Sequence, residues 1–273
     1  MALEEIAQRG LHLLGCGKMG SAMLAGWLEA GVPPGAVWVT DPNPSDWVSG
    51  LAARGLHLNE TPPEAPALCL LAVKPQMMGA ALPTVQSFGG GGTLVVSIAA
   101  GTPISAFEAV FGPGTPIVRA MPNTPAAVGK GITAIIGNAE ATEAHLALTE
   151  ALLSAIGQVV RLEHEDQMDA VTGVSGSGPA YVFHMIEALA AAAEAEGLAP
   201  DLAMQLARAT VVGAAALAER SDESAAQLRI NVTSPKGTTE AGLRHLMDPE
   251  TGLPPLMKRT VAAAAARGRE LRG

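Results

Sequence analysis

Between residue 10 and about residue 162, the sequence alternates short apolar runs with amphipathic stretches. The apolar runs have the length and the flanking turn residues of strands, and they cover 11–14, 37–40, 68–73, 94–98, 117–121, 132–136 and 159–162. Stretches with helical spacing lie between them, for example 21–30, 46–54 and 143–156, and end near Gly31, Gly55 and Gly157. This alternation predicts an α/β fold in which helices cover both faces of a parallel sheet.

The pattern changes after residue 163, where only helical spacing remains. The expected helices cover 166–174, 179–196, 200–219, 224–231, 238–247 and 253–271. We therefore expect two domains, an α/β domain over residues 1–163 and an all-helical domain over residues 164–273.

The helical half contains stretches of small residues, such as 188–195 and 211–217. Small side chains permit helices to approach closely, and these stretches are broader than one small domain needs to cover its own core. They predict that part of this half forms a subunit interface. A monomeric helical bundle with an Ala-rich core is the alternative that the sequence leaves open.

Composition argues against several kinds of partner. The formal net charge is −9, and the sequence contains no run of Lys and Arg that could form a local basic patch. Neither nucleic acid nor an anionic membrane is therefore an expected partner. The start of the chain carries Glu4 and Glu5 and lacks the pattern of a secretory signal, and long apolar windows are interrupted by Gly, Pro or charge. Cys16 and Cys69 suit neither a disulfide framework nor a metal site. We therefore expect a cytoplasmic protein that needs no metal.

A glycine-rich turn follows the first expected strand. Leu14 leads into Gly15-Cys16-Gly17-Lys18-Met19-Gly20, which has the spacing G-x-G-x-x-G between a strand and a helix. The first glycine permits the tight turn, the second lets a pyrophosphate approach the backbone, and the third lets the helix pack closely on the sheet. Free amides at the helix start then hold the phosphates. This turn predicts a site for NADPH or NADH formed by Leu14, Gly15, Cys16, Gly17, Lys18 and Met19.

Asp41 closes the second expected strand, about twenty residues after Gly20, where an acidic side chain accepts hydrogen bonds from the adenosine ribose and repels a 2′-phosphate. Residues 41–53 contain neither Lys nor Arg to receive that phosphate. Both features favour NADH over NADPH. The other interpretation is that Asp41 only forms a turn, since it begins an Asp-Pro-Asn-Pro sequence.

Four further segments, taken with the glycine-rich turn, resemble pyrroline-5-carboxylate reductases over almost the whole chain. They are AVKP at 72–75, RAMPNTP at 119–125, SGSGPAY at 175–181 and TSPKGTTE at 233–240. The resemblance implies a Rossmann-type, doubly wound N-terminal domain and an all-α C-terminal dimerisation domain. It also implies reduction of 1-pyrroline-5-carboxylate to L-proline, the last step of proline biosynthesis, by a homodimer that can stack into a decamer.

Two of these segments belong to the expected carboxyl edge of the sheet, where ligands of open α/β folds bind. The resemblance places Ala72, Val73, Lys74 and Pro75 at the cofactor, although Lys74 could equally be a surface lysine before a turn. Asn59 matches a family position near the adenosine, or is an ordinary turn residue.

Met121 is expected to contact cofactor or substrate. The prolines at 122 and 125 stiffen the segment that follows it, or, in the alternative interpretation, only shape a turn. Ser175-Gly-Ser-Gly-Pro is interpreted mainly as a break between two helices, with Ser177 as a cap. A direct substrate role for Ser175 or Ser177 is left open.

The segment 233–239 is the expected grip for the substrate carboxylate, because it contains Ser234, Gly237, Thr238 and Thr239 at the start of a helix. By resemblance, Thr239 matches the threonine proposed to hydrogen-bond the ring nitrogen, so it is the candidate catalytic residue. Its hydroxyl is a poor acid, and we expect it to position or relay a proton. The alternative interpretation makes Thr238 or Thr239 an ordinary helix cap beside Glu240.

One position departs from the family pattern, which usually has Gly-Gly where this chain has Lys236-Gly237. If the first glycine is needed for a positive φ, Lys236 is strained there; otherwise its ammonium can attract the substrate carboxylate. The competing functions are a 3-hydroxy-acid dehydrogenase, which needs a general-base lysine in the helical half, and a nucleotide sensor without catalysis. Lys236 and Lys258 are the only lysines after Lys130 and neither lies in a motif of the dehydrogenases, and a sensor would not need the paired threonines.

Overall fold

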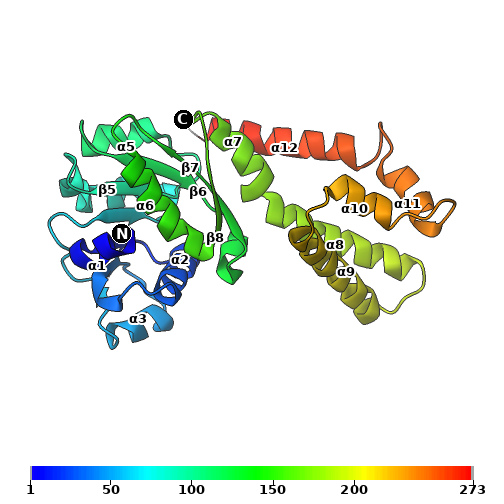
Figure 1. The fold of residues 1–273 in the computed structure, drawn as a ribbon, viewed down its shortest axis with the longest axis horizontal. Coiled ribbons are helices and arrows are strands. Elements are labelled where there is room, and N and C mark those ends of the chain that lie inside the picture. The colour runs from blue at the N-terminus through cyan, green and yellow to red at the C-terminus, as the bar shows by residue number, and fades with distance from the viewer. Residues whose placement is uncertain (1, 272–273) are drawn as a thin grey trace. The chain divides into compact units, whose positions relative to one another are not determined.

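The computed structural model describes residues 2–271 (Figure 1). By their internal contacts these residues form two compact units: one runs up to Gly176 and includes the residues from Ala264 onward, and the other is Ser177–Ala263. The two units are described separately. The change from strands to helices that the sequence places after residue 163 follows the last strand, which ends at Arg161, whereas compactness divides the chain after Gly176.

The first unit contains an eight-stranded sheet in the order β3-β2-β1-β4-β5-β6-β7-β8. Its strands are β1 Leu11–Leu14, β2 Val37–Thr40, β3 His57–Leu58, β4 Leu68–Leu71, β5 Leu94–Ser97, β6 Ile117–Met121, β7 Gly131–Gly137 and β8 Gly157–Arg161. The first six in this spatial order, from β3 to β6, are parallel. The sequence predicted all of them except the two-residue edge strand β3.

The expectation of a wholly parallel sheet is wrong at β7. This strand runs antiparallel to β6, and β8 is parallel to β7. A parallel neighbour needs a crossover of a dozen or more residues, usually a helix. The connection between Met121 and Gly131 holds only the 3-10 turn Thr124–Val128, so the chain turns back on itself there.

The helices and turns of this unit cover the two faces of the sheet. Its α-helices are α1 Ala2–Arg9, α2 Lys18–Glu29, α3 Asp46–Ala52, α4 Met78–Ala81, α5 Ile104–Phe111, α6 Glu143–Leu153 and α7 Gln167–Val171. A π-helical turn, η7, follows at Thr172–Gly176. The shorter 3-10 turns are η1 Pro34–Ala36, η2 Pro75–Met77, η3 Leu82–Thr84, η4 Gln86–Phe88, η5 Thr124–Val128 and η6 Ser154–Ile156.

Two hydrophobic cores explain why the strands have nearly continuous apolar sequences. Leu68 and Leu70 pack in the core that contains side chains of α2, α3 and α6, whereas Cys69 and Leu71 pack in the core that contains those of α4 and α5. Alternate side chains of a strand point to opposite faces, so a sheet covered on both sides has few positions for polar residues.

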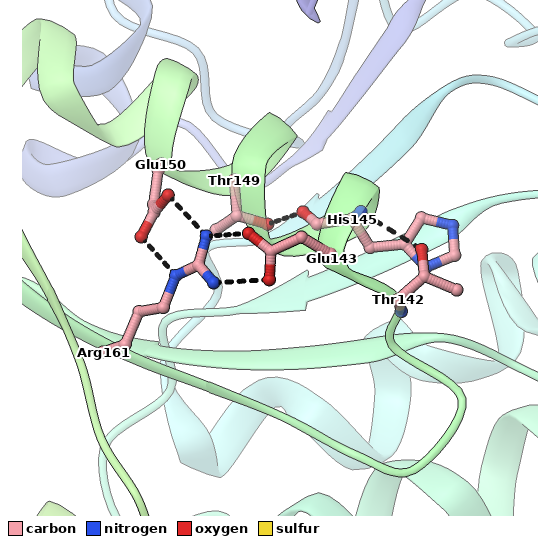
Figure 2. Close-up of polar contacts among 6 residues, drawn as sticks. All are labelled: Thr142, Glu143, His145, Thr149, Glu150 and Arg161. Atoms are coloured by element: carbon pink, nitrogen blue, oxygen red, sulfur yellow. Dashed lines mark hydrogen bonds and ion pairs between the residues drawn. The ribbon is translucent and has the colours of Figure 1, made fainter.

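Helix α6 is the crossover between β7 and β8, and its polar contacts are drawn in Figure 2. Thr142 and His145 form a reciprocal cap, in which each backbone N–H donates to the other residue's side chain at 3.1 and 3.4 Å. Arg161 on β8 donates to both carboxylate oxygens of Glu143 and of Glu150, at 2.6 to 2.8 Å. The guanidinium lowers the pKa of both carboxyl groups. The pairs are largely exposed, so they orient the helix more than they stabilise the fold.

The second unit is helical, as the sequence predicted. It contains α8 Gly178–Ala195, α9 Pro200–Arg220, α10 Ala225–Asn231, α11 Thr238–Leu246 and the greater part of α12, Leu253–Glu270. Helices α8 and α9 pack side by side, as Figure 1 shows in yellow-green and olive, and Ala190, Ala203 and Ala207 are buried. Large apolar side chains of these helices remain exposed in the single chain, among them Phe183, Leu189, Leu206 and Val212.

Candidate active site

The carboxyl edge of the sheet has a point at which the order of the strands reverses. β1 lies between β2 and β4, so the chain leaves β1 toward one side and later continues from β4 toward the other. The crevice outside the carboxyl ends of the strands at such a point is where open α/β sheets bind ligands. The glycine-rich turn follows β1 there, and Ala72–Pro75 follow β4.

The three glycines of the turn meet three different requirements. Gly15 has a φ of +88°, and a Cβ atom built on it would lie 2.8 Å from Cγ1 of Val73. A Cβ at Gly20 would lie 2.6 Å from the carbonyl oxygen of Gly15, so only glycine lets α2 begin so close to the turn. A Cβ at Gly17 would meet no other described atom within 4 Å. The first and third glycines are therefore needed by the fold, and the second faces open space.

Hydrogen bonds join the turn to both neighbouring strands. The N–H of Gly15 donates to the carbonyl of Thr40, and the N–H of Ala72 donates to the carbonyl of Leu14, each at 2.8 Å. Leu14, Gly15 and Ala72 thus lie together, as the cofactor assignment requires. Lys18 is the first residue of α2 and is exposed, and Met19 is partly buried beside the turn.

Asp41 contacts the turn through its side chain. Its Oδ2 accepts a hydrogen bond from the N–H of Cys16 at 2.6 Å, and its Oδ1 accepts one from the N–H of Asn43 at 2.8 Å. The second bond closes the turn that the Asp-Pro-Asn-Pro sequence predicted. Both interpretations of Asp41 are therefore compatible, because one carboxylate forms the turn and faces the glycine-rich segment.

Asn59 holds Asp41 from the next strand. The N–H of Asp41 donates to Oδ1 of Asn59, and Nδ2 of Asn59 donates to the carbonyl of Asp41, both at 2.9 Å. Asn59 has a φ of +56°, which asparagine tolerates better than most residues. The predicted adenosine-side residue is thus next to Asp41, but its amide serves the backbone of Asp41.

The cysteines near this edge are not nucleophiles. Cys16 and Cys69 are both free and buried, and burial raises the pKa of each thiol. A raised pKa leaves little thiolate at neutral pH. Cys16 and Cys69 instead pack as small apolar side chains in the two hydrophobic cores. Lys74, by contrast, is exposed at the start of the 3-10 turn η2 that begins with Pro75.

These residues fit a dinucleotide. The open space beside Gly17 and the free amides at the start of α2 suit a pyrophosphate. The carboxylate of Asp41, at the end of the second strand, suits ribose hydroxyls.

Met121 ends β6 at the same edge and is partly buried. Its Cε lies only 2.7 Å from the position that a Cβ at Gly176 would occupy, so Met121 packs against the turn η7. Within η7, the hydroxyl of Ser175 donates to the carbonyl of Val171 at 3.1 Å, so its proton is used within the turn and its oxygen remains an acceptor. Ser177 stands at the N-cap position of α8, but its side chain makes no capping hydrogen bond to the described helix.

The proposed substrate residues lie in the second unit, between α10 and α11. Helix α10 ends at Asn231, so Ser234 and Pro235 lie in the loop that follows it. Gly237 is the N-cap residue of α11, and Thr238 and Thr239 are its first two residues. Neither threonine is the N-cap residue, so the alternative interpretation that one of them serves as an ordinary helix cap is wrong.

Lys236 resolves the question raised by its departure from the family pattern, because its φ is +60°. Its position therefore does adopt the left-handed conformation that favours glycine. The N–H of Lys236 donates to Oε2 of Glu240, and the guanidinium of Arg244 donates to Oε1 of the same residue. These two donors lower the pKa of Glu240, the backbone one more strongly.

One residue of this edge was missed by the sequence analysis. Asn123 is buried, and its side chain links the segment after β6 to β7 and to η7. Its place in the RAMPNTP segment was the available signal. A buried side-chain amide in a proline-rich turn needs hydrogen-bond partners, and the sequence alone does not show which residues these are.

Two family models match the chain. One, described as pyrroline-5-carboxylate reductase dimerisation, matches residues 165–271, and the other, described as NADP oxidoreductase coenzyme F420-dependent, matches residues 11–101. Together they cover the helical half and the part of the sheet that holds the glycine-rich turn.

Whole-chain relatives agree with these models. The chain is 37% identical to a pyrroline-5-carboxylate reductase of Pseudomonas aeruginosa over 96% of both proteins. Among solved structures, it resembles a pyrroline-5-carboxylate reductase of Coxiella burnetii, with a TM-score of 0.88, 32% identity and coverage of 97% of this chain and 99% of that one. It also resembles the Plasmodium falciparum pyrroline carboxylate reductase with NADP bound, with a TM-score of 0.80, 27% identity and coverage of 97% and 98%. This chain therefore belongs to the pyrroline-5-carboxylate reductase family.

Proposed function

We propose that this protein reduces 1-pyrroline-5-carboxylate to L-proline with NADH or NADPH. The observation that carries the proposal is the glycine-rich turn at the reversal point of the sheet, open beside Gly17 and bordered by Asp41, in a chain of this family. When bound, the cofactor supplies a hydride to the imine carbon, so the protein itself needs neither a nucleophile nor a metal for that step.

The residues of the first unit would hold the cofactor. The amides of Gly17, Lys18 and Met19 would bind the pyrophosphate at the start of α2, and Cys16, whose N–H donates to Asp41, would border it. Asp41 would accept hydrogen bonds from the adenosine ribose, with Asn59 fixing its backbone. Ala72, Val73, Lys74 and Pro75 would border the cofactor after β4, and Lys74 is exposed enough to reach a ribose or phosphate oxygen.

The residues of the second unit would hold the substrate. The backbone amides at the start of α11 carry the positive end of the helix dipole, which suits a carboxylate. Ser234, Gly237 and Thr238 would bind that carboxylate, and Thr239 would place its hydroxyl at the ring nitrogen. Because a threonine hydroxyl is a poor acid, we propose that Thr239 positions the iminium and relays a proton from water.

The dimerisation match supports assembly into an oligomer, and we propose a homodimer that stacks further into a decamer. The apolar side chains exposed on α8 and α9 in the single chain are available for such an interface. By length and composition alone, α9 is long and apolar enough to cross a membrane. It contains Arg208 near its middle, which would be costly in lipid, so we propose that a second protein subunit covers it and that the protein works in the cytoplasm.

An assay with NADH, NADPH and racemic 1-pyrroline-5-carboxylate tests the function. We expect loss of absorbance at the reduced nicotinamide band and formation of proline in equal amount. Oxidation of a 3-hydroxy acid with NAD+, without any reduction of the imine, would instead support the rival dehydrogenase.

Replacement of Thr239 by Val tests the assigned catalytic role. We expect kcat to fall on the order of a hundredfold, because the relay of the proton is lost while shape is kept. Thr260→Val is the matched control, since Thr260 lies on α12 in the same unit and its hydroxyl donates to the carbonyl of Leu256 at 2.9 Å. Equal activity of the two variants would contradict the role of Thr239.

A further inference from the structure

Asn123 is a buried amide at the carboxyl end of β6, and it links three segments of the first unit. Its Oδ1 accepts a hydrogen bond from the N–H of Ile132 on β7 at 2.9 Å. Its Nδ2 donates to the carbonyl of Ser175 in the π-helical turn η7 at 3.2 Å. Only 8% of its surface is exposed, so both bonds are protected from water.

The same junction contains Met121, two residues earlier. Met121 packs so closely on Gly176 that a Cβ there would lie 2.7 Å from its Cε. The turn η7 is therefore fixed to the end of β6 twice, by a hydrogen bond to Asn123 and by packing against Met121. π-helical turns are uncommon and occur frequently at functional sites.

We propose that Asn123 is a positioning residue for hydride transfer: by joining β6, β7 and η7 it holds the side chain of Met121 at the carboxyl edge, where the reacting ring of the cofactor is expected. This inference rests on the proposed function, because it assumes that Met121 borders the reacting groups. Asn123 itself is not assigned a contact with substrate or cofactor.

The chain supplies a matched control at the other end of the same two strands. Asn138 follows β7, and its Oδ1 accepts from the N–H of Ile117 at 3.0 Å. Its Nδ2 donates to the carbonyl of Thr115 at 3.0 Å and to Glu108 at 3.1 Å. Asn123 follows β6 and accepts from an N–H of β7, and Asn138 follows β7 and accepts from an N–H of β6. The two side chains thus join the same pair of strands, but Asn138 lies at the amino end of β6, away from the glycine-rich turn.

The test compares Asn123→Asp with Asn138→Asp. Each change keeps the acceptor for a strand N–H and removes the donor to a carbonyl. Asn138→Asp also removes the donor to Glu108 and places a second carboxylate beside it, so it is the more demanding control for a loss of stability. We expect Asn123→Asp to lower kcat by roughly tenfold to a hundredfold with the KM for NADH within about twofold, since a misplacement of about 1 Å near the reacting atoms can cost a hundredfold. Asn138→Asp should change kcat by less than about twofold, because the contact that it removes does not reach the reacting groups.

Two further measurements separate positioning from a general loss of stability. With NADH deuterated at the transferred position, the isotope effect on kcat should rise in Asn123→Asp and stay unchanged in Asn138→Asp. Hydrogen exchange of the cofactor-free protein should become faster in the peptide that covers residues 172–176 only in Asn123→Asp. Equal kcat, isotope effect and exchange in the two variants would overturn the proposal.

If Asn123→Asp does not fold, Gly176→Ala tests the same junction from the other side. The added methyl would push the flexible end of Met121 away from η7 without removing a hydrogen bond. We expect the same loss of kcat at unchanged KM for NADH, and wild-type kcat in Gly176→Ala would overturn the proposal. A wild-type protein that forms no proline would contradict the proposed function instead, and the exchange measurement would still report on Asn123.

Discussion

Oδ2 of Asp41 accepts a hydrogen bond from the backbone N–H of Cys16 at 2.6 Å, which joins the end of β2 to the glycine-rich turn after β1. The carboxylate also accepts from Asn43, and its backbone is held by Asn59. Each carboxylate oxygen has one lone pair left, because it accepts one protein N–H. Asp41 is therefore held in place and can still accept hydrogen bonds from a ribose.

We expect this chain to use NADH with a higher kcat/KM than NADPH, because the fixed carboxylate of Asp41 would repel a 2′-phosphate. Asp41→Asn should lower the ratio of kcat/KM for NADH to that for NADPH by roughly tenfold, which corresponds to about 1.4 kcal/mol. Steady-state kinetics with both coenzymes measure the ratio. Asp46→Asn makes the same charge change on the exposed start of α3 and should leave the ratio unchanged. A wild-type preference for NADPH would refute the assignment.

The space beside Gly17 gives a second prediction. Gly17 has φ −68° and ψ −162°, which any residue adopts, and a Cβ there would contact no described atom within 4 Å. Gly17→Ala should therefore leave the fold intact but raise the dissociation constant for NADH by tenfold or more, on the order of 1.4 kcal/mol, because the methyl occupies the expected path of the pyrophosphate.

Calorimetric titration with NADH and thermal unfolding without it test this together. Gly50→Ala is the control, since a Cβ at Gly50 also meets open space but on α3. Gly20→Ala should lower the stability of the cofactor-free protein as well, because its Cβ would lie 2.6 Å from the carbonyl oxygen of Gly15. Unchanged binding of NADH by Gly17→Ala would place the pyrophosphate elsewhere.

Most of the fold could be predicted because its periodicity is strong. The buried strands and the long helices of the second unit have bounds close to those expected from apolar spacing alone. Helix α1, Ala2–Arg9, was missed: it is only eight residues long, and among its side chains from Glu4 to Arg9 only Ile6 is buried. The reversal at β7 was missed because an apolar run does not reveal its direction.

The site was predictable where one residue type has one physical use. The spacing of the glycines is enough to predict a tight turn and close packing of the following helix. The structural roles of Gly15 and Gly20 were therefore correctly predicted. Asn123 and Asn59 differ, since an amide has many possible partners and only the tertiary structure selects Ser175 for one and Asp41 for the other. The roles of Ser234, Gly237, Thr238 and Thr239 at a substrate stay predictions.

The positive φ of Lys236 predicts that glycine is better tolerated there. For a residue with a Cβ atom, the left-handed conformation destabilises the folded state by about 1 to 2 kcal/mol. Glycine avoids this strain, but its greater conformational freedom in the unfolded chain lowers the free energy of unfolding by about 0.5 to 1 kcal/mol. Lys236→Gly should therefore raise the free energy of unfolding by up to about 1.5 kcal/mol, measured by urea denaturation. We also expect equal or higher activity.

Lys236→Ala separates the backbone from the charge. Alanine keeps the strain and removes the ammonium, so it should have wild-type stability. If both variants raise the KM for 1-pyrroline-5-carboxylate and neither becomes more stable, the ammonium of Lys236 attracts the substrate and the strain is unimportant.

His12 lies inside the sheet on β1, and only 2% of its surface is exposed. Its Nε2 is 2.8 Å from the hydroxyl of Thr40, its Nδ1 is 3.6 Å from the thiol of Cys69, and its ring meets Phe88 edge-on. These neighbours carry no negative charge that could stabilise an imidazolium. Burial therefore lowers the pKa of His12 from 6.5 to about 4.

The lowered pKa of His12 makes the folded protein less stable in mild acid. Below pH 6.5 the unfolded chain binds a proton at His12 that the folded chain does not bind until about pH 4, so the free energy of unfolding falls as the pH falls between these values. The loss attributable to His12 should be about 1.6 kcal/mol between pH 6.5 and pH 5, because the slope is about half of 1.4 kcal/mol per pH unit at pH 6.5 and approaches that value at pH 5. Urea denaturation of wild type and His12→Gln at both pH values gives the change in the free energy of unfolding with pH for each protein. The difference between these two changes is the loss attributable to His12. His184→Gln, which changes an exposed histidine on α8, should keep the wild-type slope. If His12→Gln also loses stability with falling pH as steeply as wild type, the buried neutral imidazole is not what makes the fold sensitive to acid.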